Sequence, residues 1–71
     1  MNIDKISDKI SLYKGKELSF RFNGSRNQIE EFNGMIIDTY PSIFIVKLTT
    51  KDILKSFSYS DILIRKLVIK E

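Results

Sequence analysis

The hydrophobic pattern of this chain changes its period at Gly15, and this change restricts the fold more than any other feature. Before Gly15, apolar residues recur at helical spacing and form one stripe, made of Ile3, Ile6, Ile10 and Tyr13. After Gly15, apolar Leu18, Phe20 and Phe22 alternate with polar residues, as expected of a half-buried strand. The sequence therefore predicts a helix over residues 1–14 followed by a β structure over residues 16–70.

The predicted helix has recognisable ends. Asn2 can cap its first turn, and Gly15 follows its last residues, where a left-handed backbone favours glycine. A helix of about a dozen residues is marginal in isolation. We therefore expect its apolar stripe to pack on the rest of the chain.

Turn residues divide the remainder into short strands. Asn23 to Asn27 predicts a hairpin turn, Gly34 a bulge or sharp bend, and Pro41 a break. The run Ile43–Leu48 is almost continuously apolar and predicts a central strand buried on both faces. One helical turn, residues 60–63, is expected with Ser60 or Asp61 as its cap. Beyond the first strand, the expected strands cover residues 28–40, 43–48, 56–59 and 64–69.

These elements predict a mainly β fold: an N-terminal helix followed by a small five-stranded SH3-like or Sm-like barrel, with one helical turn before the last strand. The whole chain, residues 1–71, is expected to form a single domain. The predicted core consists of Leu18, Phe20, Phe22, Ile37, Phe44, Val46, Leu48, Ile62 and Leu63, with Ile6 and Ile10 docking on it.

Composition argues against catalysis and metal binding. The chain has no cysteine and no histidine, so it lacks the usual zinc ligands and the usual proton shuttle at neutral pH. Asp61 has no catalytic partner in sequence and is interpreted as a helix cap, while Phe57 and Tyr59 are interpreted as core residues rather than a base-stacking platform. We expect no enzyme activity and no cofactor.

Two segments resemble a known family. The first is Thr39–Val46, which reads Thr-Tyr-Pro-Ser followed by a hydrophobic strand, and the second is Ser56–Leu63. With Gly34, they resemble the Veg family of small bacterial proteins. The resemblance implies an SH3-like barrel, no catalysis, and a role in stimulating biofilm formation through gene expression.

Two binding hypotheses remain open. Lys14, Lys16, Arg21 and Arg26 could form a basic strip that binds nucleic acid, whereas exposed Tyr40 beside a proline could anchor a protein partner. The net charge is only +3, and the turn that is rich in basic residues in the family keeps only Arg26. We therefore favour a protein partner, with a transcriptional regulator as one candidate, and keep nucleic acid as the alternative.

The location of the protein in the cell is predicted from the lack of a signal peptide and of a membrane-spanning segment in the sequence. The first twelve residues hold four charges and no apolar run, and no segment approaches the roughly 18 apolar residues of a membrane span. We expect a soluble cytoplasmic protein that does not bind membranes. The sequence allows either a monomer or a homodimer.

Overall fold

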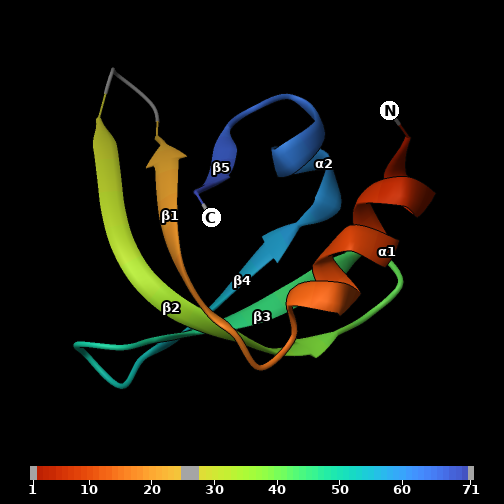
Figure 1. Ribbon diagram of the computed structural model, residues 1–71. Coiled ribbons are helices and arrows are strands. Elements are labelled where there is room, and N and C mark those ends of the chain that lie inside the picture. The colour runs from red at the N-terminus through yellow and green to blue at the C-terminus, as the bar shows by residue number, and fades with distance from the viewer. Residues whose placement is uncertain (1, 25–27, 71) are drawn as a thin grey trace.

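A computed structural model describes residues 2–24 and 28–70. Along the chain, a helix is followed by four strands, a short helix and a last strand (Figure 1). The bounds are α1 Ile3–Tyr13, β1 Glu17–Asn23, β2 Ile29–Thr39, β3 Ile43–Leu48, β4 Leu54–Ser58, α2 Tyr59–Leu63 and β5 Leu67–Lys70. Arg26, one of the predicted site residues, lies outside the described part of the chain.

Helix α1 begins and ends as its sequence predicts. The Asn2 side chain accepts a hydrogen bond of 2.9 Å from the backbone N–H of Lys5, and Gly15 has a φ of 86°. Ile6 and Ile10 are buried among the core side chains of the sheet. Packing of this stripe supplies the stability that a short isolated helix lacks.

The strands form one antiparallel sheet in the order β4-β3-β2-β1-β5. The mainly β fold with a leading helix and a short helix before the last strand is confirmed. The sheet is strongly curved but not closed, because within the described residues no ladder joins β4 to β5 (Figure 1). Both outer strands are short, and β4 ends where the chain turns directly into α2. The fold therefore resembles a barrel only loosely.

Strand β2 bends at two neighbouring features. A β-carbon on Gly34 would lie 2.6 Å from Val46 Cγ1, so only glycine allows β3 to approach this closely. The register irregularity itself falls between Ile36 and Asp38, not at Gly34 as the sequence suggested. It leaves Ile36 buried and Ile37 exposed, which corrects the predicted burial of Ile37.

One hydrophobic core joins the helix to the inner face of the sheet. Its fully buried members include Phe20, Phe44, Val46 and Tyr59. Phe44 stacks on Tyr59 with ring centroids 5.6 Å apart, and Phe57 is also buried, which confirms the core interpretation of Phe57 and Tyr59. Leu48 is buried as predicted, while Leu18, Phe22 and Ile62 are partly buried against the core.

Two further predictions of burial were wrong. Strand β3 alternates between buried and exposed residues, with Ile43 and Lys47 exposed, so it is not buried on both faces. Leu63 is exposed at the end of α2, because that helix buries Tyr59 instead. The helices cover a single face of this curved sheet. A strand inside it therefore buries one face in the core and exposes the other.

Helix α2 is held by a reciprocal cap. Its N-cap is Ser58, whose side chain accepts from the backbone N–H of Asp61, while the Asp61 carboxylate accepts from the backbone N–H of Ser58. Asp61 thus has the structural role that the sequence suggested, although the capping residue is Ser58 rather than Ser60 or Asp61.

Candidate binding surfaces

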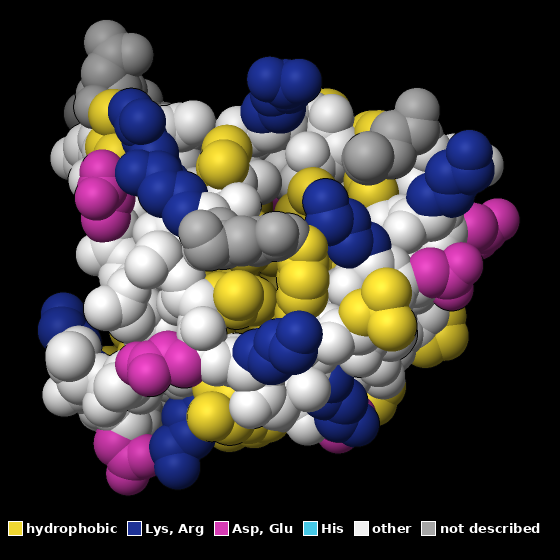
Figure 2. Space-filling model, in the orientation of Figure 1, with side chains coloured by type: hydrophobic (Ala, Val, Ile, Leu, Met, Phe, Trp, Pro, Cys, Tyr) yellow, Lys and Arg dark blue, Asp and Glu magenta, His cyan; other side chains and the backbone are white. Residues whose placement is uncertain are grey.

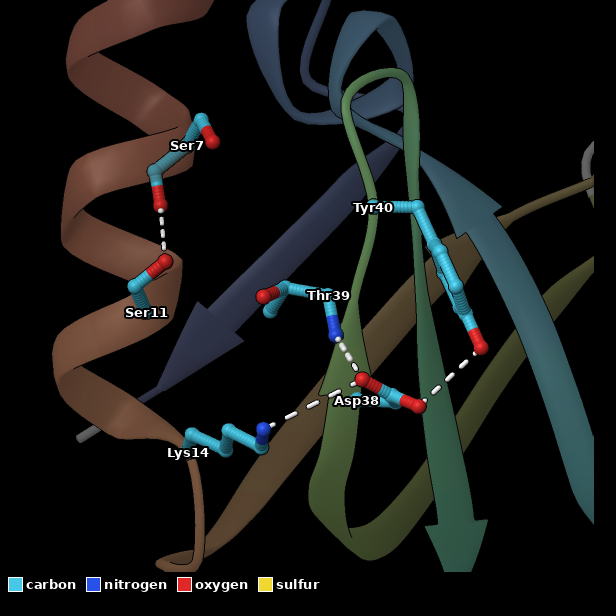
Figure 3. Close-up of polar contacts among 6 residues, drawn as sticks. All are labelled: Ser7, Ser11, Lys14, Asp38, Thr39 and Tyr40. Carbon is cyan, nitrogen blue, oxygen red and sulfur yellow. Dashed lines mark hydrogen bonds and ion pairs between the residues drawn. The ribbon is translucent and has the colours of Figure 1, made fainter.

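Asp38 brings together two predicted site residues from distant parts of the chain (Figure 3). Lys14 follows α1 and places its Nζ 3.9 Å from Asp38 Oδ1, while the Tyr40 hydroxyl donates a 3.0 Å hydrogen bond to Asp38 Oδ2. The backbone N–H of Thr39 donates to the same carboxylate at 3.0 Å. Lys14 and Tyr40, which the sequence assigned to rival hypotheses, therefore belong to one cluster.

The carboxylate changes the chemistry of Tyr40. The hydrogen bond to Asp38 raises the pKa of the Tyr40 phenol above its ordinary value of 10.0, and the negative charge of Asp38 acts in the same direction. Only the neutral phenol can donate this hydrogen bond, which is why the bond raises the pKa of Tyr40. Tyr40 is 49% exposed, and its hydroxyl is bonded to Asp38.

The remaining predicted cations are spread along the first strand. Lys16 is exposed in the connection between α1 and β1, and Arg21 is half-buried in β1 between Glu31 of β2 and Val68 of β5. The Arg21 Nε is buried without a hydrogen-bond partner in the described residues. Since Lys14 is paired with Asp38, Lys16 and Arg21 are the described members of the predicted strip that have no ion pair within residues 2–24 and 28–70.

The outer face of the sheet carries an apolar patch that sequence analysis missed. Met35, Lys47 and Leu54 are cross-strand neighbours on β2, β3 and β4, and Ile43 lies on the same face of β3 as Lys47. We define the outer patch as the exposed residues Met35, Ile37, Tyr40, Ile43 and Leu54. The nearly continuous apolar run Ile43–Leu48 shows no alternation of apolar and polar residues, so Lys47 was the one signal in the sequence for the exposed face of β3.

Charges around the outer patch are largely neutralised. Lys47, which lies between Met35 and Leu54 across the strands, forms an ion pair of 3.1 Å with Asp52. Lys55 lies on the opposite face, where it pairs with Glu30 at 3.0 Å and stands 5.5 Å from the centre of the Phe32 ring. Within the described ranges, no group of acidic side chains is arranged to hold a metal ion.

The fold and this surface define a class: a small, mainly β protein with a curved open sheet, a covering helix and an apolar outer face. The chain belongs to the Veg family, because the family model described as the biofilm formation stimulator VEG matches residues 1–70. This description gives the family a regulatory role. A search of curated proteins finds no match to the chain. In the described residues, no helix is long and apolar enough to cross a bilayer.

Proposed function

We propose that this protein is a non-catalytic cytoplasmic regulator that influences gene expression by binding a protein partner through the outer patch. The observation that carries the proposal is the gathering of Met35, Ile37, Tyr40, Ile43 and Leu54 on one exposed sheet face. Exposed apolar side chains that lie close together favour protein contact, and the aromatic ring of a tyrosine is a typical anchor. Membership of a family of biofilm stimulators supports a regulatory output.

The distribution of charge favours a protein over nucleic acid. Binding to phosphates depends on lysine and arginine side chains that are available to release counterions. Two cations beside the outer patch, Lys14 and Lys47, already face carboxylates of Asp38 and Asp52. Such a surface combines exposed apolar side chains with paired charges, and protein interfaces likewise combine apolar with polar contacts.

The proposal is tested by capturing the partner from cytoplasmic extract after nuclease treatment. Leu54→Asp and Tyr40→Ala should each abolish capture, because they remove apolar contacts of the outer patch. Tyr40→Phe should retain it, since the ring remains. Leu12→Asp is the matched control: Leu12 is 75% exposed on α1 and does not belong to the patch.

A band shift with random DNA or RNA at physiological salt would instead favour nucleic acid as the partner. In that case the variant with Lys14, Lys16, Arg21 and Arg26 neutralised should lose binding. About four phosphate contacts on duplex DNA would give a log–log salt slope near −3.6. Such a slope, together with no capture of protein after nuclease treatment, would replace the protein partner by nucleic acid.

A further inference from the structure

A cleft of about 210 Å³ opens between α1, the end of α2 and β5. Apolar side chains form most of its wall, including Ile6 and Ile10 from α1 and Leu67 and Ile69 from β5. Figure 2 shows hydrophobic side chains in a hollow near the middle of the molecule, with Lys and Arg side chains around it. This cleft shares no residue with the outer patch.

The charged side chains that line the cleft are both cations. Lys9 comes from α1 and Arg65 from the turn after α2, and no carboxylate of the described residues lines the cleft with them. Neither cation forms an ion pair within residues 2–24 and 28–70. An apolar wall with two cations complements a molecule that combines an apolar group with negative charge.

Arg65 occupies a backbone position that usually favours glycine. Arg65 has a φ of 61°, in the left-handed region, directly after the C-cap residue Ile64 of α2. Glycine is the residue that usually occupies this position, because it adopts positive φ without a steric cost. The fold needs only the backbone here: the Arg65 N–H donates to the carbonyl of Ile62, and the Arg65 carbonyl accepts from Asn23 Nδ2. Arg65 lines the cleft, and its side chain forms no hydrogen bond or ion pair within the described residues.

From these observations we infer that the cleft binds an acidic amphipathic segment of a protein. One or two apolar side chains of that segment enter the cleft, and its carboxylates meet Lys9 and Arg65. The volume supports this choice, because 210 Å³ is below the roughly 300–1,000 Å³ of sites for small molecules. A guanidinium also binds carboxylates in a bidentate manner. The inference rests on the proposed function only in that the chain binds proteins.

The experiment is selection of a displayed library of random short peptides on the immobilised full chain. Peptides in which aspartate or glutamate flanks a large apolar residue should be enriched. The double variant Lys9→Gln/Arg65→Gly should bind the selected peptides about tenfold or more weakly. Arg65→Gly relieves the left-handed backbone, so its melting temperature should equal or exceed that of the parent chain, and loss of binding cannot be attributed to unfolding.

A matched control removes the same charge elsewhere. Lys51→Gln/Lys70→Gln changes two lysines that do not line the cleft and should leave peptide affinity within about twofold, apart from a general effect that salt screens. Lys9→Glu/Arg65→Glu should instead select peptides with lysine or arginine beside the apolar residue. No enrichment on the parent chain, or acidic peptides that bind the Gln/Gly variant equally well, would overturn the inference.

The two proposals fail in different ways. Tyr40→Ala removes an outer-patch residue and should leave peptide selection unchanged while abolishing partner capture. Failed peptide selection with intact, Tyr40-dependent capture would discard the cleft as a binding site and keep the proposed function. Successful selection that depends on Lys9 and Arg65, with no capture through the outer patch, would support the cleft and discard the patch.

Discussion

Gly34 is the glycine at which an added side chain would meet the closest contacts. An added β-carbon would lie 2.9 Å from the carbonyl oxygen of Lys47 as well as against Val46, and backbone atoms cannot move aside as a flexible side chain can. We expect Gly34→Ala to lower the free energy of unfolding by about 1–3 kcal/mol, the usual cost of overpacking. Urea denaturation measures this change.

The control for this prediction is Gly24→Ala. A β-carbon there would have its nearest neighbour at 3.4 Å, an ordinary contact, and Gly24 does not have positive φ. Its effect on the urea midpoint should be clearly smaller. Equal midpoints for Gly34→Ala and the parent chain would show that β2 and β3 can separate at this position without cost.

The Tyr40 phenol provides a second test of a single contact. Asp38 raises its pKa, so Asp38→Asn should bring the pKa down towards 10.0. Because the folded pKa lies above the unfolded value, the stabilising contribution of the bond is complete below about pH 10 and is lost as pH rises through the raised folded pKa. Titration of the Tyr40 ring carbon by NMR separates it from Tyr13 and Tyr59. A pKa unchanged by Asp38→Asn would exclude the hydrogen bond in solution.

Among the helices and strands, α2 depends most on local hydrogen bonds. It is a helix of five residues between β4 and β5, and the reciprocal bonds of Ser58 and Asp61 fix its start. Ser58→Ala should destabilise the protein by about 1 kcal/mol, because the backbone N–H of Asp61 loses its acceptor. Thermal unfolding measures the loss. Ser60→Ala is the matched control, since Ser60 is exposed and its side chain forms no hydrogen bond within the described residues; equal losses for the two variants would contradict the cap.

The short α2 also explains where the outer strands end. The chain leaves β4 at Ser58 and enters β5 only at Leu67, so the two strands do not form a ladder with each other within the described residues. Helices α1 and α2 contact each other beside this opening. The cleft that contains Lys9 and Arg65 lies beside β5, which pairs with β1 on one edge only and has helices rather than a second strand near the other.

For the molecule as a whole, Phe44 connects the sheet to the second helix. It is fully buried, and its ring lies 6.0 Å from that of Phe57 and 5.6 Å from that of Tyr59. Phe44→Ala should cost about 3–5 kcal/mol through lost burial and the resulting cavity, which approaches the total stability of a small domain. Ile43→Ala, at the exposed neighbouring position, should cost far less. An unchanged melting temperature for Phe44→Ala would show that the face of β3 that carries Phe44 does not form the core.

Several parts of the site could be predicted from single residues, and others could not. Exposure of Tyr40 beside Pro41 follows from turn chemistry alone. Its bond to Asp38, and the pairing of that carboxylate with Lys14, require the end of α1 to lie beside β2, which no local pattern specifies. The roles of Lys9 and Arg65 at a common cleft likewise depend on contact between elements from opposite ends of the chain.

The sequence by itself determined the features that arise within a few residues. The stripe of α1, its cap at Asn2, the positive φ at Gly15 and the alternation of β1 all follow from backbone geometry and hydrophobic period. Tertiary structure decided which residue of the pair Ile36 and Ile37 is buried, which face of β3 is exposed, and that the sheet stays open. These outcomes depend on register and on competition between elements for one core, because a shift of one residue reverses the face of a strand and no local preference opposes it.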